Sequence, residues 1–466
     1  MSARERRRLP VSVLKYRDYR LLWSGQAIVV VGTQMQSVAL AWQVYELTGS
    51  VVQLGLLGLV RAITLMLASL LGGPMADRSN RRRLLLITQS MMSLQALALA
   101  ALTYSGVISV WQIFVIGAIT SATSAFDGPA RQALIPTLIP RDRLTDAMSL
   151  NILSMNTARM VGPAIGGVSL AILGAGTTYA LHASTFLAVI VALAVMQTRA
   201  AAPSMRQSGL QAITEGLRFI AGSQVIWGIM VLDFAATLLG STVGLAPVFA
   251  EDVLRAGPTG LGLLLSAPAA GSVFGGFVLS VVRLPVRPGN LMVLAVIGYG
   301  ACLAAFGFTT TIPFALLALF GAGVADSLSV AVRHTIRTLA TPDELRGRVS
   351  AAHSALAMGG PRLGEFQSGM SAALIGPRWA MFAGGVGCML AAMVMKRVAP
   401  AMSTWSVADV PPHADDIAAV ATSSGPIVAA VAGAGAHRDG SHPAPSRAGT
   451  TQSLSLIHIS EPTRPY

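Results

Sequence analysis

Long apolar runs recur along the chain, and short polar or charged segments separate them. A helix needs about twenty apolar residues to cross a bilayer core, whereas a barrel strand needs about ten residues of alternating character. The runs here are continuous and near the helical length, so we predict an all-α polytopic membrane protein. Twelve membrane-spanning helices are expected, near residues 21–45, 51–71, 84–104, 109–126, 148–172, 178–196, 225–249, 260–282, 290–308, 312–332, 352–374 and 378–398.

Positive charge gathers in every second connection between these runs. With twelve spans, one side of the membrane receives twenty-five lysines and arginines, and the other side receives only Arg255 and Arg378. Short basic connections stay in the cytoplasm. We therefore expect an even number of spans and both termini in the cytoplasm.

The two halves of the chain carry a weak internal repeat. Pro140–Leu144 and Pro342–Leu345 precede the fifth and eleventh predicted spans, and each places acidic residues at the positive end of the coming helix. Those spans contain Gly162-Pro163 and Gly360-Pro361. The pattern is typical of two pseudo-symmetric six-helix bundles related by an axis along the membrane normal.

These patterns also predict the organisation of the chain. We expect a basic cytoplasmic arm (1–20), an N-terminal six-helix half (21–198), a cytoplasmic linker with an amphipathic helix at 210–220 (199–222), a C-terminal six-helix half (223–399) and a tail (400–466). The tail is rich in Ala, Pro, Ser and Gly, which predicts disorder. Its last stretch, 454–466, resembles the translation of a sequencing-library adapter, so we assign it no function.

Composition narrows the class of protein. The 466 residues are 53% hydrophobic and 11% charged, whereas a soluble protein is about a quarter charged, so a soluble enzyme is excluded. The net charge of +13 is spread over the connections rather than gathered on one patch, so nucleic acid is not an expected partner. Cys302 and Cys388 lie inside apolar runs and predict packing residues.

The motifs of catalysis and nucleotide binding are missing from the sequence. Neither lysine, Lys15 or Lys396, is followed by the Ser or Thr of a Walker A loop. The histidines lack the His-Glu-x-x-His spacing, and no Gly-x-Ser-x-Gly elbow occurs. We therefore expect no enzyme, no cofactor and no metal site. Transport driven by an ion gradient is the favoured function. A passive pore and a sensor are the alternatives.

A short charged segment, residues 73–83, joins the second and third predicted spans. Gly73 would allow close helix packing, and Asp77 would complement a helix N-terminus. Arg81 or Arg82 would pair with Asp127 at the end of the fourth span. This predicts a cytoplasmic latch, and the alternative is cytoplasmic positive charge alone. The candidate gate comprises Gly73, Asp77, Arg78, Arg81, Arg82, Asp127 and, near the end of the tenth span, Asp326.

Residues 73–83 resemble the loop signature of the major facilitator superfamily, with Asn80 in place of the glycine before the arginine pair. Asn also tolerates left-handed backbone. The resemblance implies the major facilitator fold, with a midplane cavity exposed alternately to each side. Several segments further resemble the subgroup that contains bacterial enterobactin exporters, namely 42–49, 126–132, 247–250, 346–350 and 363–369.

The fifth predicted span contains Arg159-Met-Val-Gly162-Pro163-Ala-Ile-Gly166-Gly167, which resembles a signature of antiporters and exporters in this superfamily. Gly162 and Gly166 form a small-x-x-x-small packing face, and Pro163 removes a backbone hydrogen bond and bends the helix. The resemblance implies a bend that seals one side of the cavity and favours export over uptake. Ordinary helix packing is the alternative.

Ionisable residues inside spans are costly and should face a cavity or a partner. Arg61, Arg159 and Asp233 lie in the second, fifth and seventh spans, and Arg362 and Glu365 share a face of the eleventh. We predict that Asp233 or Glu365 takes and releases the coupling proton, because a carboxyl group in a partly dry cavity can exchange a proton near neutral pH. Static ion pairs are the alternative.

Gln36 and Gln43 share a face of the first predicted span. Two interpretations stay open for these amides: hydrogen bonds between helices, or the lining of a polar substrate cavity.

Together these features predict a monomeric transporter in the bacterial inner membrane, with the lipid bilayer, protons and a small molecule as partners. The expected function is proton-coupled export of an amphipathic, siderophore-like or drug-like molecule. Alternatives are a multidrug or macrolide efflux pump of the same fold and a non-transporting membrane sensor or secretion partner.

Overall fold

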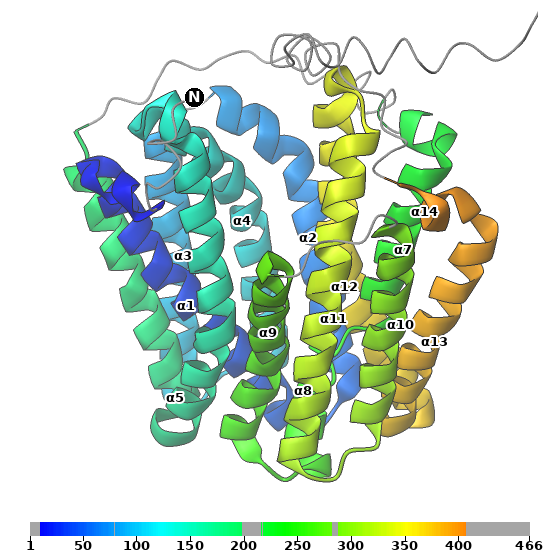
Figure 1. Cartoon of the computed structure of the whole chain (residues 1–466). Helices are drawn as coiled ribbons and strands as arrows, with labels where there is room; N and C mark the ends of the chain where they lie inside the picture. Colours follow the sequence, from blue (N-terminus) through cyan, green and yellow to red (C-terminus); the bar gives the residue numbers. More distant parts are fainter. Residues whose placement is uncertain (1–9, 79, 198–215, 217, 282–287, 407–466) are drawn as a thin grey trace, which may run out of the picture. The chain divides into compact units, whose positions relative to one another are not determined.

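The computed structural model describes residues 10–78, 80–197, 216, 218–281 and 288–406, and within these ranges every regular element is a helix. Figure 1 shows the helices packed side by side along one common direction. The first half contains η2 (Pro10–Lys15), α1 (Arg17–Thr48), α2 (Val51–Arg78), α3 (Arg81–Tyr104), α4 (Val110–Leu138), η3 (Arg141–Arg143) and α5 (Leu144–Val195).

The second half contains α7 (Gln224–Leu239), α8 (Ala246–Val248), the π-helical turn η4 (Phe249–Val253), α9 (Gly257–Val281), α10 (Pro288–Gly307), α11 (Ile312–Ala340), α12 (Asp343–Ile375), α13 (Pro377–Val398) and α14 (Pro400–Thr404). Gly174, with φ 78°, breaks α5 into the predicted fifth and sixth spans. Among the described residues, nine helices are long and apolar enough to cross a membrane. With α5 counted as two, and with α7 and α12, the described helices are consistent with twelve spans.

Several predicted span ends differ from the ends of the helices. The seventh span was expected at 225–249, but α7 ends at Leu239, and Gly240 follows as its C-cap. The fourth and tenth spans were expected to end at 126 and 332, but α4 and α11 continue to Leu138 and Ala340. In both cases the apolar pattern stops before the helix does, because the last turns carry polar side chains.

The predicted charged turn is two residues long. α2 continues to Arg78 and α3 begins at Arg81. Asn80 has φ −65° and caps α3, with its side chain accepting a hydrogen bond from the Arg83 backbone N–H at 3.2 Å. The expected left-handed backbone is therefore wrong, because the residue starts a helix. The side chains of Gly73, Asp77 and Arg78 lie outside the described residues.

Both ends of the described chain pack onto the helices. The Tyr19 hydroxyl donates to the Ala147 carbonyl at 3.0 Å, and Val13 is fully buried, so part of the predicted arm belongs to the core. Met402 and Trp405 are buried against the second half, so residues past the predicted boundary at 400 pack with its helices. Most of the predicted linker helix at 210–220 lies outside the described residues.

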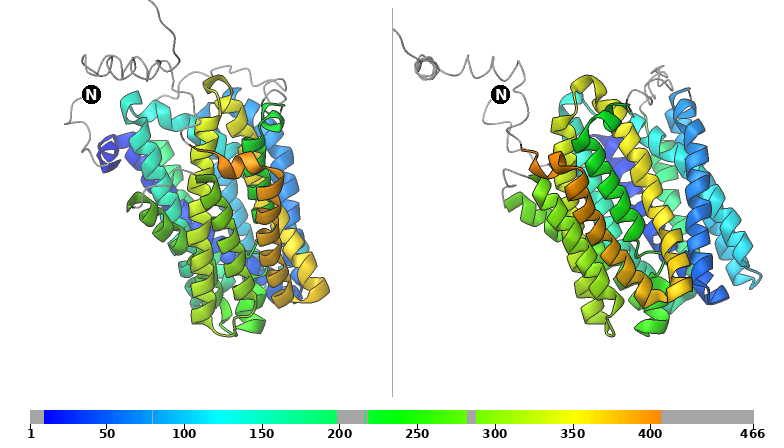
Figure 2. Two further views of the ribbon diagram at one scale, coloured as in Figure 1. Left: turned by 45° about the vertical axis from the view of Figure 1, so that its right-hand side comes forward. Right: turned by 90° about the vertical axis from the view of Figure 1, so that its right-hand side faces the viewer.

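Glycines bring the two halves together along two seams. In the first, α5 meets α9, and a Cβ at Gly262 would lie 2.5 Å from the Pro163 carbonyl oxygen and 2.9 Å from the Gly167 Cα. In the second, α2 meets α12 (Figure 2, right), and a Cβ at Gly369 would lie 3.1 Å from the Gly55 Cα. Small residues allow this close approach.

Both seams lie near the same ends of their helices. The contacting part of α2 follows the connection at Gly49, and that of α5 precedes the break at Gly174. The contacting part of α9 follows Gly257, and that of α12 precedes Gly376. These are the connections that the charge count assigns to the outer side of the membrane.

The seam between α5 and α9 makes Gly262 intolerant of even one methyl group. We expect Gly262→Ala to lower the melting temperature of the detergent-solubilised protein, because overpacking costs about 1–3 kcal/mol. Gly276 on the same helix has no atom within 4 Å of an added Cβ. Gly276→Ala should melt at or slightly above the parent temperature, because Ala favours a helix over Gly. Equal melting temperatures of the two variants would contradict the close packing of Gly262 against α5.

Candidate functional site

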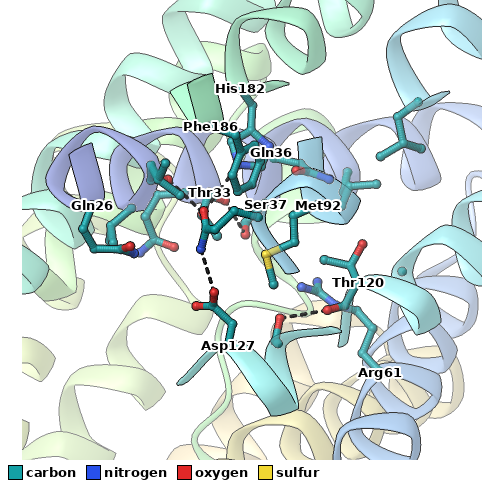
Figure 3. A pocket seen from close by; sticks show the side chains of 18 of the residues that line it. Gln26, Thr33, Gln36, Ser37, Arg61, Met92, Thr120, Asp127, His182 and Phe186 are labelled. Carbon is teal, nitrogen blue, oxygen red and sulfur yellow. Dashed lines mark hydrogen bonds between the residues drawn. The ribbon is translucent and has the colours of Figure 1, made fainter. Parts of the chain in front are cut away.

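A pocket of about 280 Å³ lies within the N-terminal half, between α1, α2, α3, α4 and α5. Figure 3 shows Asp127 and Arg61 on the side opposite His182 and Phe186. Apolar side chains such as Met92 and Phe186 line it together with many polar ones. The polar lining comprises Gln26, Thr33, Gln34, Gln36, Ser37, Arg61, Gln89, Thr120, Ser124, Asp127, Arg131, Arg159 and His182.

Asp127 is a buried wall residue of this pocket, within α4. Its Oδ1 accepts hydrogen bonds from Thr88 at 3.0 Å and from the Gln89 amide at 2.7 Å. Its Oδ2 lies 3.2 Å from the Arg131 guanidinium, one helical turn away. The prediction that Asp127 pairs with Arg81 or Arg82 is therefore wrong, because α4 continues for several turns beyond this aspartate.

Arg81 and Arg82 instead hold backbone carbonyls at helix ends. Arg81 donates to the Ala133 carbonyl at 2.8 Å, near the end of α4. Arg82 donates to the carbonyls of Leu193 at 2.6 Å and Ala194 at 2.9 Å, in the last turn of α5. The carbonyls of Leu193 and Ala194 are among the last four of α5, so Arg82 satisfies orphan acceptors and complements the helix dipole. The start of α3 is thereby tied to the ends of α4 and α5.

A second charged cluster lies where α2 meets α12. Arg362 and Glu365 form the predicted ion pair at 2.8 Å. A Cβ at Gly58 would lie 2.7 Å from the Glu365 Oε2, so this carboxylate sits directly over α2. Arg61, one turn further along α2, interacts electrostatically with both Arg362 and Glu365. The cluster therefore joins the two halves of the protein.

A small polar cavity lies in the C-terminal half, lined by Asp233, Tyr299, Asp326 and Arg333 among others. Asp233 on α7 pairs with Arg333 on α11, and both side chains are nearly buried. Asp326 also lines this cavity, well inside α11. Its predicted place near the end of the tenth span is therefore wrong, because α11 continues to Ala340. Arg333, counted in a cytoplasmic connection from the sequence, lies inside a helix.

Comparison with known families decides the class of protein. A family model described as "Transmembrane secretion effector" matches residues 9–433. The chain belongs to this family. It is a transporter of the major facilitator type, as the sequence predicts, and hence a multi-pass membrane protein that acts on a small molecule.

Known relatives agree with this family. The enterobactin exporter EntS of Escherichia coli O1:K1 / APEC is 24% identical over 388 residues, which cover 83% of this chain and 93% of the relative. EntS of Shigella boydii serotype 18 matches with the same identity and coverage.

Solved structures confirm the fold. A bacterial homologue of the human lysosomal transporter Spinster, in an inward-facing and unoccupied conformation, superimposes with a TM-score of 0.67 at 16% identity, covering 84% of this chain and 99% of that one. The D-xylose–proton symporter gives a TM-score of 0.63 at 16% identity, covering 84% of this chain and all of that one.

Within this transporter the glycines of the helix-five motif pack against two helices, Gly167 against α9 and the other two against α1. A Cβ at Gly162 would lie 2.6 Å from the Gln34 Cβ, and one at Gly166 would lie 2.7 Å from the Met35 Cα, so both glycines contact α1. The predicted small-residue packing face is confirmed. The backbone of α5 keeps helical dihedral angles through Pro163 and departs from them at Gly174.

The two predicted roles of the glutamines are divided between them. Gln36 lines the pocket. Gln43 bonds between helices: its amide donates to Thr103 at 3.2 Å and its carbonyl accepts from the Tyr179 hydroxyl at 2.8 Å. Arg159 lines the pocket and interacts electrostatically with Asp326 of the other half.

Sequence reasoning missed several polar residues of these sites. Gln89 and Arg131 contact Asp127, and Arg333 contacts Asp233. His182 was not missed, because the sequence favours a packed or solvated histidine there; it is buried, with its ring 4.8 Å from Phe186 and its Nε2 3.5 Å from the Thr33 hydroxyl. The i, i+4 spacing of Asp127 and Arg131 was the one available signal, and it is visible in the sequence.

The Asp233–Arg333 pair should behave as a coupled unit. Loss of one partner from a buried ion pair leaves an uncompensated charge and costs roughly 3–5 kcal/mol. We therefore expect Asp233→Asn and Arg333→Gln each to lower the melting temperature of the solubilised protein more than the double variant does. Asp142→Asn, in an exposed pair at 3.4 Å, should change little. Additive single effects would contradict the coupling.

Proposed function

We propose that this transporter exports an amphipathic small molecule, siderophore-like or drug-like, in exchange for protons, by alternating access. It would act as a monomer in the bacterial inner membrane, with both termini in the cytoplasm. The relatives that are named enterobactin exporters support export, and the uneven charge of the connections supports the orientation.

The position of Arg61 carries this proposal. Arg61 lines the pocket of the N-terminal half, and it also interacts with Glu365 in the seam between α2 and α12. A substrate that changes the charge around Arg61 would therefore change the electrostatic interactions in the seam. Alternating access requires this kind of link, because a ligand shifts a conformational equilibrium only through its differential interactions with the two states.

Glu365 is the stronger candidate for proton coupling. Its carboxylate pairs with Arg362 at 2.8 Å, and it packs over Gly58 of the other half. Protonation would remove the negative charge between Arg362 and Arg61, so the repulsion between these two arginines would act across the seam without compensation. Asp233 is the second candidate, and protonation there would release Arg333 within the C-terminal half.

The structure fits a state that is closed on the outer side. Both glycine seams lie near the connections assigned to that side. In this proposal, opening outward separates the seams, while the basic cytoplasmic connections approach one another. The predicted gate residues Gly73, Asp77 and Arg78 would act there, together with Arg81 and Arg82, whose backbone contacts tie α3 to α4 and α5.

Two alternatives use the same features differently. A multidrug or macrolide efflux pump would share the fold and the proton coupling but would accept bulkier, less polar molecules. A membrane sensor or secretion partner would bind a ligand in the pocket without moving it. The polar lining of the pocket, with its amides and arginines, favours a substrate with strong polar groups.

Proton coupling is testable with purified protein in proteoliposomes that carry an imposed pH gradient. A panel of siderophores and drugs is added, and substrate-dependent proton flux is followed with a pH-sensitive dye. We expect Glu365→Gln to abolish this flux and Asp233→Asn to reduce it, because neither amide can carry a proton through the cycle. Glu251→Gln, at an exposed position, is the matched control. Full proton-driven transport by both variants would refute the assignment.

The gate can be tested by charge reversal. Asp77→Lys should slow substrate-dependent proton flux several-fold, because it places a cation among the arginines of the 73–83 segment. Ser280→Lys adds a cation at an exposed position of α9, where the second half of the chain has no aspartate, and should have a smaller effect. Equal effects, or none at either position, would contradict the gate. The charges of the 73–83 segment would then serve only to keep this connection in the cytoplasm.

A further inference from the structure

The pocket of the N-terminal half carries an excess of positive charge. Arg61, Arg131 and Arg159 line it, and Asp127 is its one acidic lining residue among the described residues. Both oxygens of Asp127 are engaged, one by Thr88 and Gln89 and the other by Arg131. The aspartate therefore compensates Arg131, and two cations remain.

Arg61 shares the acid in its surroundings with another arginine. Its stem packs beside Gly117, where an added Cβ would lie 3.7 Å from the Arg61 Cγ. Its Nε is buried and has no hydrogen-bond partner. The acid in its surroundings, Glu365, is already 2.8 Å from Arg362. Three groups with two positive charges and one negative charge thus meet at this point.

Arg159 lies at another part of the pocket wall, and its side chain is exposed. Asp326, the acid with which it interacts, belongs to the other half and also interacts with Arg333. Among the described residues, neither Arg61 nor Arg159 forms an ion pair within 4.0 Å. A guanidinium at membrane depth without a counter-charge is costly, so a site with two of them favours an anionic ligand.

We propose that this pocket is an anion subsite, in which Arg61 and Arg159 bind a negatively charged group of the substrate. The inference rests on the proposed transport function and narrows its substrate class to organic anions with an apolar body. Met92 and Phe186 would pack against that body, and the amides of Gln34 and Gln36 would bind further polar groups. Cationic amphipaths, by contrast, would be repelled.

A matched pair of probes tests the subsite. Naphthalene-2-sulfonate and naphthalene-2-sulfonamide share one apolar body, but only the sulfonate is anionic near neutral pH. Binding to the purified full chain in detergent is measured by isothermal titration calorimetry. We expect the sulfonate to bind about tenfold more tightly or better, because hydrogen bonds between charged partners are stronger than neutral ones. Equal affinity, or tighter binding of the sulfonamide, would overturn the proposal.

Variants locate the binding charge. Arg61→Gln should remove most of the preference for the sulfonate, and Arg61→Lys should keep part of it. Arg141→Gln, which removes a cation at an exposed position of the same half, should keep all of it. If Arg61→Gln does not fold, Arg159→Gln is the test variant, because it should also reduce the preference for the sulfonate over the sulfonamide. An unchanged preference in the folded variants would refute the assignment.

The same measurements separate this proposal from the transport function. Binding is observed without a proton gradient, so selective sulfonate binding without substrate-dependent proton flux would support the subsite and refute coupled transport. Proton flux driven by a neutral or cationic substrate, with no preference for the sulfonate, would refute the subsite and leave coupled transport intact.

Discussion

The arrangement of this protein depends on the compensation of charge inside a membrane. A lone charged side chain at membrane depth costs about 2.5–3.5 kcal/mol even on the mildest scale. Three ion pairs meet this constraint: Asp127 with Arg131, Asp233 with Arg333, and Glu365 with Arg362. Two of them are formed within one helix, one turn apart, and are set by local sequence. The third joins α7 to α11 in the C-terminal half.

The two halves use this constraint differently. In the C-terminal half, Asp233 and Asp326 face Arg333 around a small cavity that leaves little space for a ligand. In the N-terminal half, the aspartate and its arginine leave space beside them, and two further arginines line it. The halves are related in their helices but not in their polar interiors. The N-terminal half therefore has space for the proposed anionic ligand, whereas the charges of the small C-terminal cavity compensate one another.

The fold was predicted well from the sequence because membrane-spanning helices are recognisable as long apolar runs. The relatives and solved structures confirm that fold. The Arg362–Glu365 pair was predicted because spacing within a helix is visible in a sequence. Asp127 and Asp326 were misplaced because hydropathy falls where a helix turns a polar face to a cavity, and that fall resembles the end of a span. Arg333 was missed for the same reason. Its partner Asp233 lies a hundred residues earlier, and only packing brings them together.

Close packing and charge meet at one place in this structure. Gly58 has no side chain, and this allows the Glu365 carboxylate to lie directly on α2, one turn from Arg61. A larger residue at position 58 would push the carboxylate away and separate the seam from the pocket. The glycine thus has an electrostatic consequence as well as a steric one. Because Arg61 belongs to both the seam and the pocket, a negative charge bound in the pocket as proposed would act directly on the contact between the two halves.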